Sequence, residues 1–274
     1  MRGYDETNQR GLFVSSYHGA HKYDRRGVLL HTESAPGFYI DAMPAVTPDV
    51  TGDGVSDVLM RENVRGQVSV LDGKSLAAVA SHTTGHTGRG KALIPWSHES
   101  LTGSMRILAI ADSGISMLET VQGQTGKAAG GDSAMVLGGL RPVFSFPISP
   151  IVAWEMADLG DDNEDEIILA TRCGGLLVIS GQGELVRGTV VASQIFDFTV
   201  WDGFRDGLRI LVATDQGLVF LDGNLRAVAP ALSNTQNCRL IKCLAMGETK
   251  RGVCLFADGR VSVLSDSQDV VRPN

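Results

Sequence analysis

Two short acidic segments carry the residue types and spacing that best suit binding of a hard cation. The first runs from Asp49 to Asp57 and the second from Asp158 to Glu166. In each, carboxylates recur two to four residues apart around a tight turn, so alternate side chains and one backbone carbonyl can converge on a single ion. This set of oxygen ligands predicts calcium. The alternative is a metal-free turn, because turn geometry alone also favours Asp, Asn and Gly.

Each acidic segment runs directly into an apolar stretch, and such stretches recur along the whole chain. Six copies contain a short apolar run, a turn with Gly and a second short apolar run, and successive copies begin 43 to 60 residues apart. Short runs rich in β-branched residues on both sides of a turn predict hairpins of β-strands. The first runs begin at Leu12, Val58, Ile107, Ile167, Ile210 and Val253, and the second runs begin at Ala20, Gln67, Ile115, Leu176, Leu218 and Arg260.

A repeat of roughly 40–50 residues built from several strands is typical of a β-propeller blade. The sequence therefore predicts an all-β fold, a single β-propeller domain over residues 1–274 with about six four-stranded blades. Seven blades, a piece of a larger ring and a β-sandwich are the alternatives. Innermost strands are expected at 38–46, 92–96, 150–156, 195–201 and 241–246, and outer strands at 28–30, 76–79, 185–190 and 225–228.

Three parts of the chain depart from the repeat. Residues 1–10 are too polar to predict an innermost strand for the first copy. Propellers commonly complete one blade with strands from both termini, so residues 269–273 are expected to pair there. The Gly-rich segment at about 121–140 accounts for the longest interval, and we expect it to be a loop inserted between the third and fourth units.

The acidic segments in this setting resemble the FG-GAP or VCBS repeats of integrin-α-like β-propellers. The family pattern is Asp-x-Asp/Asn-Gly-Asp-Gly-x-x-Asp/Glu followed by a strand. Residues 49–57 depart from it only at Thr51, which replaces Asp or Asn. Residues 158–166 keep acids at the first, fifth and ninth positions but have Gly160 at the third and no glycine at the fourth and sixth.

The resemblance implies that both loops bind calcium where the second strand of a blade begins. Because Gly160 offers no side-chain ligand, the second site is expected to be weaker or completed by water. Arg106 and Arg209 occupy the ninth position in two other copies, so those copies are expected to lack metal and to keep the turn through an Arg contact. The implied ligands are Asp49, Thr51, Asp53, Asp57 and the Val55 carbonyl in the first loop, and Asp158, Asp162, Glu166 and the Glu164 carbonyl in the second.

Composition limits the classes of partner. The formal net charge of −7 argues against nucleic acid, which usually requires a basic surface. No stretch reaches the roughly 18 consecutive apolar residues that a membrane-spanning helix needs. The N-terminus is polar and lacks the apolar core of a secretory signal. The expected location is therefore the cytoplasm if Met1 is the natural start, and the extracellular space or cell surface if the chain is a processed fragment.

No residue set predicts catalysis. Neither a Gly-x-Ser-x-Gly elbow nor a phosphate-binding loop is present. His82 and His86 have i, i+4 spacing but flank two Thr and a Gly, so we expect exposed loop histidines and not a metal pair. The four cysteines form no metal-type pair and are expected to be ordinary packing residues. Trp96, Trp154 and Trp201 lie near the ends of expected innermost strands, and packing is favoured over a role in binding a protein or sugar.

These observations favour a non-enzymatic, calcium-stabilised propeller that acts as a protein-interaction module or as a subunit of an assembly. The alternative is a propeller that binds or cleaves carbohydrate by lyase-type chemistry, because some related propellers are polysaccharide lyases. The sequence leaves the question of enzymatic activity open.

Overall fold

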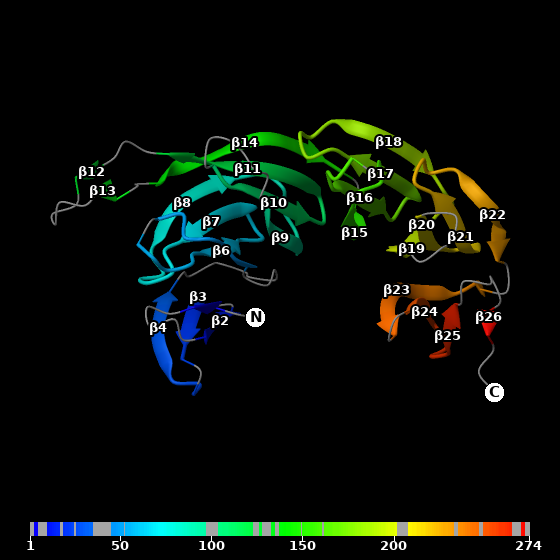
Figure 1. The fold of residues 1–274 in the computed structure, drawn as a ribbon, viewed down its shortest axis with the longest axis horizontal. Helices are drawn as coiled ribbons and strands as arrows, with labels where there is room; N and C mark the ends of the chain where they lie inside the picture. The colour runs from blue at the N-terminus through cyan, green and yellow to red at the C-terminus, as the bar shows by residue number, and fades with distance from the viewer. Residues whose placement is uncertain are drawn as a thin grey trace. The chain divides into compact units, whose positions relative to one another are not determined.

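In a computed structural model, the described part of the protein folds into antiparallel β-sheets (Figure 1). The described residues form six four-stranded sheets and one short hairpin, without an α-helix. Accordingly, no helix in this part of the chain has the length and apolar character to cross a membrane. The structure describes residues 3–4, 10–16, 19–24, 26–34, 45–51, 53–96, 104–122, 126–127, 133–134, 137–148, 150–160, 162–201, 208–232, 235–246, 249–264 and 270–271.

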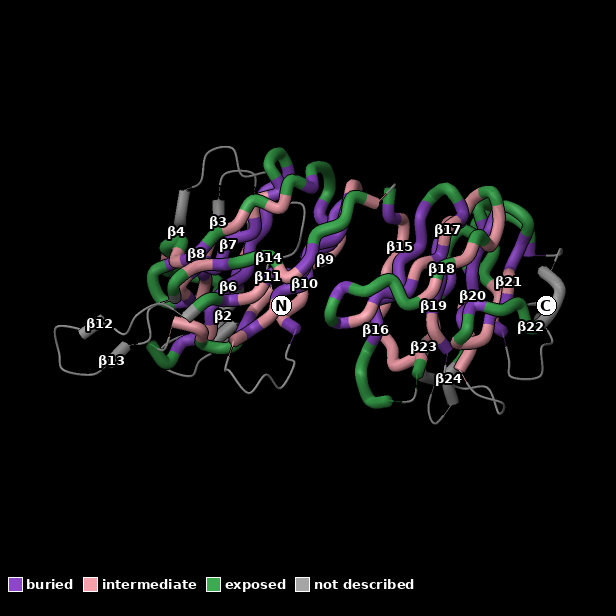
Figure 2. Tube along the Cα trace, turned by 90° about the horizontal axis from the view of Figure 1, so that it is seen from above, coloured by how far each residue is buried: buried purple, intermediate pink, exposed green. Residues whose placement is uncertain are grey.

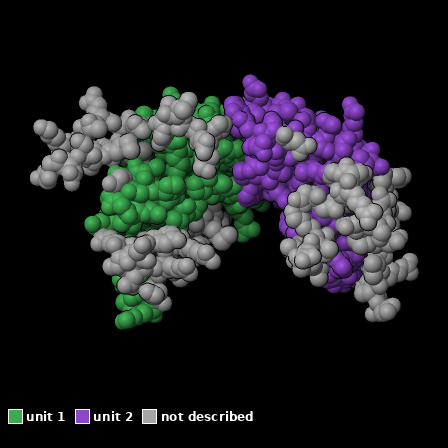
Figure 3. Space-filling view, in the orientation of Figure 1, with its two compact units in different colours: residues 1–148 green, residues 149–274 purple. Residues whose placement is uncertain are grey.

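The chain divides into two compact units, residues 1–148 and 149–274 (Figure 3). Unit 1 contains the first three sheets. The first sheet has the order β1 (Gly3–Tyr4), β2 (Arg10–Ser16), β3 (Gly19–Tyr23) and β4 (Leu29–Ser34). The second sheet has the order β5 (Ala45–Val46), β6 (Val58–Arg61), β7 (Gln67–Leu71) and β8 (Ala78–Thr83). The third sheet has the order β9 (Gly90–Trp96), β10 (Arg106–Ala111), β11 (Gly114–Gln122) and β14 (Leu137–Pro147).

Unit 2 contains the other three sheets, each again built from strands that follow one another along the chain. The fourth sheet comprises β15 (Ile151–Ala157), β16 (Glu166–Thr171), β17 (Gly175–Ile179) and β18 (Leu185–Val190). The fifth sheet comprises β19 (Ile195–Trp201), β20 (Arg209–Thr214), β21 (Gly217–Asp222) and β22 (Ala227–Leu232). The sixth sheet comprises β23 (Cys238–Met246), β24 (Thr249–Phe256), β25 (Val261–Leu264) and β26 (Val270–Val271).

The core of each unit lies between neighbouring sheets. The second strands β6, β10, β16 and β20 are almost entirely buried (Figure 2), which explains why their sequences are continuous apolar runs. In unit 1, Leu59 and Val70 of the second sheet share a cluster with Ile107 of the third. In unit 2, Ile168 of the fourth sheet and Phe198 of the fifth do the same. The repeated sheets are thus held face to face by apolar burial.

The six predicted hairpins are confirmed as the second and third strands of the six sheets. The predicted innermost strands at 92–96, 150–156, 195–201 and 241–246 correspond to β9, β15, β19 and β23. Of the expected strand at 38–46, the structure has Ala45–Val46, and residues 38–44 lie outside the described part. Trp96 and Trp201 are buried, as packing predicts, and Trp154 is half-buried.

Two expectations about the chain ends are wrong. Gly3–Tyr4 (β1) forms the first strand of the first sheet, the position expected for an innermost strand, because pairing depends on backbone groups and a polar segment can supply them. Val270–Val271 pairs with β25 of the sixth sheet and not with the first. A strand usually pairs with its neighbour in sequence, and β26 follows β25 after a short connection.

The Gly-rich segment lies within the third sheet and not between two sheets. β11 extends to Gln122 and pairs with β14, which begins at Leu137. Between them the segment carries the hairpin of β12 (Gly126–Lys127) and β13 (Ser133–Ala134). The long interval in the repeat therefore reflects an extended connection between the third and fourth strands of one sheet.

Candidate functional site

The first acidic loop connects β5 to β6 in the second sheet. Asp49 accepts hydrogen bonds from two backbone amides of the loop, that of Asp53 at 3.2 Å (N to Oδ1) and that of Gly54 at 2.7 Å (N to Oδ2). Asp53 in turn accepts the Val55 amide at 2.9 Å. Gly54 has φ +86°, a left-handed conformation in which a side chain is strained. The loop is therefore a compact turn organised around the Asp49 carboxylate.

The second acidic loop connects β15 to β16 and repeats this arrangement. Asp158 accepts the amides of Asp162 at 3.2 Å and Asn163 at 2.8 Å, and Asp162 accepts the amide of Glu164 at 2.9 Å. Asn163 stands where the first loop has Gly54 and likewise has a positive φ, +64°. Asn tolerates this region better than most residues. The predicted correspondence of the two loops therefore extends to backbone conformation and hydrogen bonds.

The last carboxylate of the first loop, Asp57, is fully buried. It accepts the backbone amides of Val50 and Thr51 at 2.8 and 3.0 Å within the loop, and that of Gly73 at 2.9 Å after β7. The Thr51 hydroxyl also donates to Asp57 at 3.3 Å. Burial raises the pKa of Asp57, and the backbone hydrogen bonds oppose this shift. Asp57 thus ties the acidic loop to the turn that follows β7 at the same end of the sheet.

The last carboxylate of the second loop, Glu166, accepts the Leu159 amide at 2.8 Å. A Cβ placed on Gly160 would lie 3.6 Å from Asp162 Oδ2 and 3.7 Å from Glu166 Oε1. The two carboxylates therefore flank the position where the family pattern has an acidic side chain, and Gly160 leaves that space open.

The loops meet the chemical requirement for calcium, because all predicted side-chain and carbonyl ligands are oxygen atoms. Among the residues that the structure describes, no three Asp, Glu, His or Cys side chains are grouped closely enough to hold one ion by themselves. The structure brings each set of predicted ligands into one loop, where the carboxylates bind backbone amides.

The arginines at the ninth position of the third and fifth copies begin β10 and β20. Arg209 donates to the Leu208 carbonyl at 3.1 Å, a contact at the same turn. Arg106 lies opposite Glu119 in the pairing of β10 with β11, and its positive charge contributes to lowering the pKa of Glu119, after the hydrogen bonds from Ser104 and Arg141.

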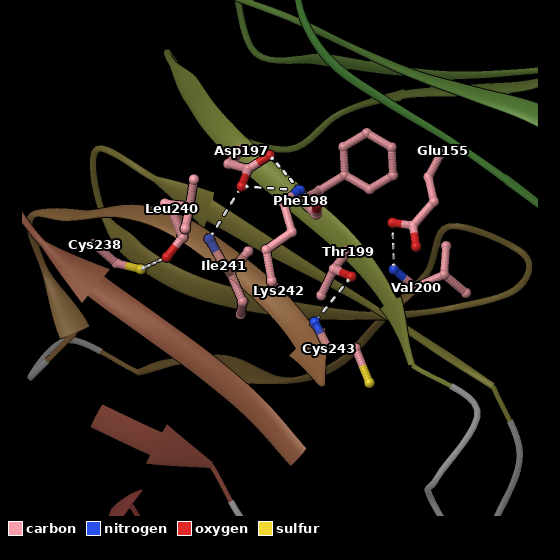
Figure 4. Close-up of polar contacts among 10 residues, drawn as sticks. All are labelled: Glu155, Asp197, Phe198, Thr199, Val200, Cys238, Leu240, Ile241, Lys242 and Cys243. Carbon is pink, nitrogen blue, oxygen red and sulfur yellow. Dashed lines mark hydrogen bonds and ion pairs between the residues drawn. The ribbon is translucent and has the colours of Figure 1, made fainter. Parts of the chain in front are cut away.

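A row of polar residues on the innermost strands of unit 2 was not foreseen from the sequence (Figure 4). Glu155 on β15 accepts the backbone amide of Val200 on β19 at 2.9 Å. Asp197 on β19 accepts the amide of Ile241 on β23 at 3.1 Å. Each carboxylate thus binds a backbone donor on the innermost strand of the following sheet, a donor that an edge strand would otherwise leave unpaired. Each carboxylate and the amide that it binds lie 44 or 45 positions apart in sequence. This separation is close to the length of one repeat, so an alignment of the polar positions in the repeats could have found these contacts.

Lys242 completes this polar row. Its Nζ lies 3.3 Å from both oxygens of Asp197, and its side chain is half exposed. The Thr199 hydroxyl accepts the Cys243 amide at 3.3 Å. Burial raises the pKa of Glu155, although the Val200 amide and the charge of Lys242 oppose the shift. These contacts join the innermost strands of the fourth, fifth and sixth sheets, so the carboxylates of the row have a structural role.

His86 corrects the expectation of exposed loop histidines. It is 9% exposed, and its Nε2 lies 2.8 Å from the hydroxyl of Ser145 on β14. Arg61 on β6 donates to the His86 carbonyl at 2.5 Å. Burial lowers the pKa of His86, and the charge of Arg61 adds to this. A Cβ on Gly114 would lie 2.3 Å from Nδ1, so glycine makes the room in which this imidazole links the second and third sheets.

Repeated four-stranded antiparallel sheets packed face to face define the β-propeller class, and each sheet is one blade. No protein-family model matches the chain, and no curated protein matches it.

Solved structures with the same fold cover almost the whole chain. BBS1N, crystallised in complex with ARL6DN, is 12% identical over 92% of this chain and 74% of its own, with a TM-score of 0.53. BamB from Moraxella catarrhalis is 15% identical over 99% and 72%, with a TM-score of 0.57. A rhamnogalacturonan lyase from Bacillus licheniformis is 12% identical over 99% and 56%, with a TM-score of 0.60. These neighbours are β-propellers, and the likeness establishes the fold.

Proposed function

We propose that this protein is a non-enzymatic β-propeller that acts as a protein-interaction module or as a subunit of an assembly. The observation that carries the proposal is the likeness to BBS1N, which covers 92% of this chain and was crystallised with a protein partner, ARL6DN. Several of the described carboxylates already bind backbone amides, which supports a structural role for them. The loop carboxylates bind loop amides, and Glu155 and Asp197 bind amides of the next blade.

Affinity purification with the folded chain, followed by reconstitution from purified proteins, tests this proposal. The heat-unfolded chain is the control for non-specific capture. The expected result is at least one protein that forms a complex of fixed stoichiometry with the folded chain in titration calorimetry. If none of the recovered proteins binds when purified, the interaction module is contradicted.

A second candidate is a carbohydrate-binding or lyase-type propeller, which the likeness to a rhamnogalacturonan lyase favours. This chain spans 56% of the lyase, so the comparison concerns part of that enzyme. Incubation with rhamnogalacturonan and measurement of the ultraviolet absorbance of unsaturated products tests for cleavage, and a glycan array tests for binding. Signals in either assay that the heat-unfolded chain lacks would favour this candidate over the interaction module.

We also propose that calcium stabilises the acidic loops, in the manner of FG-GAP or VCBS repeats. Support comes from the oxygen-only ligands and from the shared backbone frame of the two loops. Calcium at 100 times its Kd would stabilise the fold by about 2.7 kcal/mol at one site, provided that it does not bind the unfolded chain. The melting temperature should therefore rise with calcium and fall with EDTA, and the Asp53→Asn variant should respond less. An unchanged melting temperature in calcium and in EDTA would contradict the proposal.

A further inference from the structure

A serine and a histidine that lie far apart in sequence meet between the second and third sheets of unit 1. His86 follows β8, and Ser145 lies on β14, an edge strand of the third sheet. The Ser145 hydroxyl lies 2.8 Å from Nε2 of His86. Ser145 pairs in register with Ser116 of β11, and the two hydroxyl oxygens lie 2.9 Å apart. The two serines therefore share one face of the sheet, and the imidazole lies against that face.

The three residues differ in their access to solvent. Ser145 is exposed, whereas Ser116 is fully buried and His86 is buried beside it. A small molecule that approaches from solvent therefore reaches Ser145 before it reaches the imidazole or the second serine. A reactive hydroxyl with a nucleophile's role must be accessible in this way, and the base beneath it need only be within hydrogen-bond reach.

The imidazole is oriented so that one ring nitrogen serves Ser145. Its Nδ1 faces the backbone of β11, since a Cβ on Gly114 would lie 2.3 Å from that atom. Burial lowers the pKa of His86, and the positive charge of the buried Arg61 on β6 acts in the same direction, whereas a hydrogen bond to the Ile115 backbone opposes the shift. The ring is therefore neutral at neutral pH. A proton on Nδ1 leaves Nε2 as the atom that accepts the Ser145 proton.

We propose that Ser145 is a nucleophilic serine, activated by His86, that accepts an acyl group from activated esters. The Ser145 oxygen attacks the carbonyl carbon of the ester while His86 Nε2 takes the hydroxyl proton. The bond between the carbonyl carbon and the leaving oxygen then breaks, and His86 returns the proton to that oxygen. The products are an acylated Ser145 and a free alcohol, without any change of oxidation state. Because the acyl group stays on the serine, this modification is independent of the proposed partner binding.

Treatment of the folded wild-type protein with p-nitrophenyl acetate tests the site. The absorbance of released p-nitrophenolate follows the reaction, and peptide mass spectrometry locates the acetyl group. Ser145 should be acetylated faster than any other serine and faster than in the urea-unfolded chain. The rate at Ser145 should rise with pH through the lowered pKa of His86, below the ordinary value of 6.5, and then level off. Acetylation of amino groups without Ser145, or a rate that does not level off, would overturn the proposal.

Variants separate the nucleophile from its base. Ser145→Ala should lose the fast release of p-nitrophenolate. Ser113→Ala is the matched control and should react as wild type, because Ser113 lies in the turn before β11 and its hydroxyl donates to the Thr87 carbonyl at 2.8 Å. His86→Gln should slow acetylation of Ser145 about 100-fold, as loss of a general base does. An unchanged rate in Ser145→Ala, or in folded His86→Gln, would overturn the proposal. If His86→Gln does not fold, the wild-type pH profile decides the role of His86.

Discussion

The two acidic loops share a backbone frame but differ in how that frame is attached to the rest of the protein. In both, the first carboxylate accepts the amides of the fifth and sixth loop residues, and the carboxylate of the fifth residue accepts the amide of the seventh. Asp57 ends the first loop fully buried and reaches the Gly73 amide beyond β7, whereas Glu166 is 9% exposed and binds the nearby Leu159 amide. A shared motif therefore fixes the turn, and the ninth residue decides how far the turn contributes to the core.

A second comparison concerns Gly73 and Gly223, which follow the third strands of the second and fifth blades. Lys22 of the first blade donates to the Gly73 carbonyl at 2.9 Å, and Arg187 of the fourth blade donates to the Gly223 carbonyl. Lys22 is buried, whereas Arg187 is half-exposed. Gly73 is also in close contact with the first loop, since a Cβ there would lie 1.9 Å from the Ser56 carbonyl oxygen. Asp57, Gly73 and Lys22 thus form one buried assembly in unit 1.

Removal of the last carboxylate of each loop should give the largest difference in the free energy of unfolding between the two loops. Asp57→Ala leaves the buried Gly73 amide and two half-buried loop amides without an acceptor, and we expect it to lower the free energy of unfolding by about 3 kcal/mol. Glu166→Ala should cost about 1 kcal/mol, because only the half-buried Leu159 amide loses its acceptor and water can reach it. Urea denaturation followed by circular dichroism measures both. Equal losses would show that burial of Asp57 does not matter.

Replacement of Lys22 should likewise lower the free energy of unfolding more than replacement of Arg187, but the difference between the two variants should be smaller. Lys22→Met removes the buried donor to the Gly73 carbonyl and the contact with the Phe13 ring, and should cost about 2 kcal/mol. Arg187→Met should cost about 1 kcal/mol, because its site is more accessible to water. A double-mutant cycle with Asp57→Ala should show coupling for Lys22→Met and none for Arg187→Met. If the effects of Lys22→Met and Asp57→Ala are additive, the lysine does not act together with the acidic loop.

The raised pKa of Asp57 predicts how the stability of unit 1 depends on pH. Between the ordinary value of 3.8 and its folded value, the folded protein binds more protons at this site than the unfolded chain. The contribution of Asp57 is therefore fully present below 3.8 and is lost as pH rises through the folded pKa. Relative to Asp57→Asn, the wild type should gain stability as pH falls through this window. Denaturant titrations of both proteins across acidic pH measure the difference, and a constant difference would contradict the assignment.

The smallest expected effect concerns the residue with positive φ in each loop. Gly54→Asn should change the free energy of unfolding by less than about 0.5 kcal/mol, because Asn163 adopts the same conformation in the second loop. Gly54→Ala is the matched control and should cost about 1 kcal/mol through backbone strain. Thermal denaturation resolves the two. If Asn is no better tolerated than Ala, the loops are less alike than their hydrogen bonds indicate.

The hairpins and both acidic loops could be predicted because they depend on residues close together in the chain. Apolar runs such as Val58–Met60 and Ile167–Leu169 form strands wherever a turn lets them pair. Asp49 and Asp158 cap amides only four and five residues away. Burial of His86 was missed, because it depends on Gly114 and Ser145, which lie far away in sequence.

The amino-acid sequence by itself determined the repeat, the strands and the frame of each acidic loop, since local spacing decides which groups can bond within a turn. Tertiary structure decided that Asp57 reaches Gly73 and that Glu155 and Asp197 bind the next blade. Those contacts join different strands or blades. Their physical cause is the packing of one sheet against another, which brings together groups that no local spacing relates.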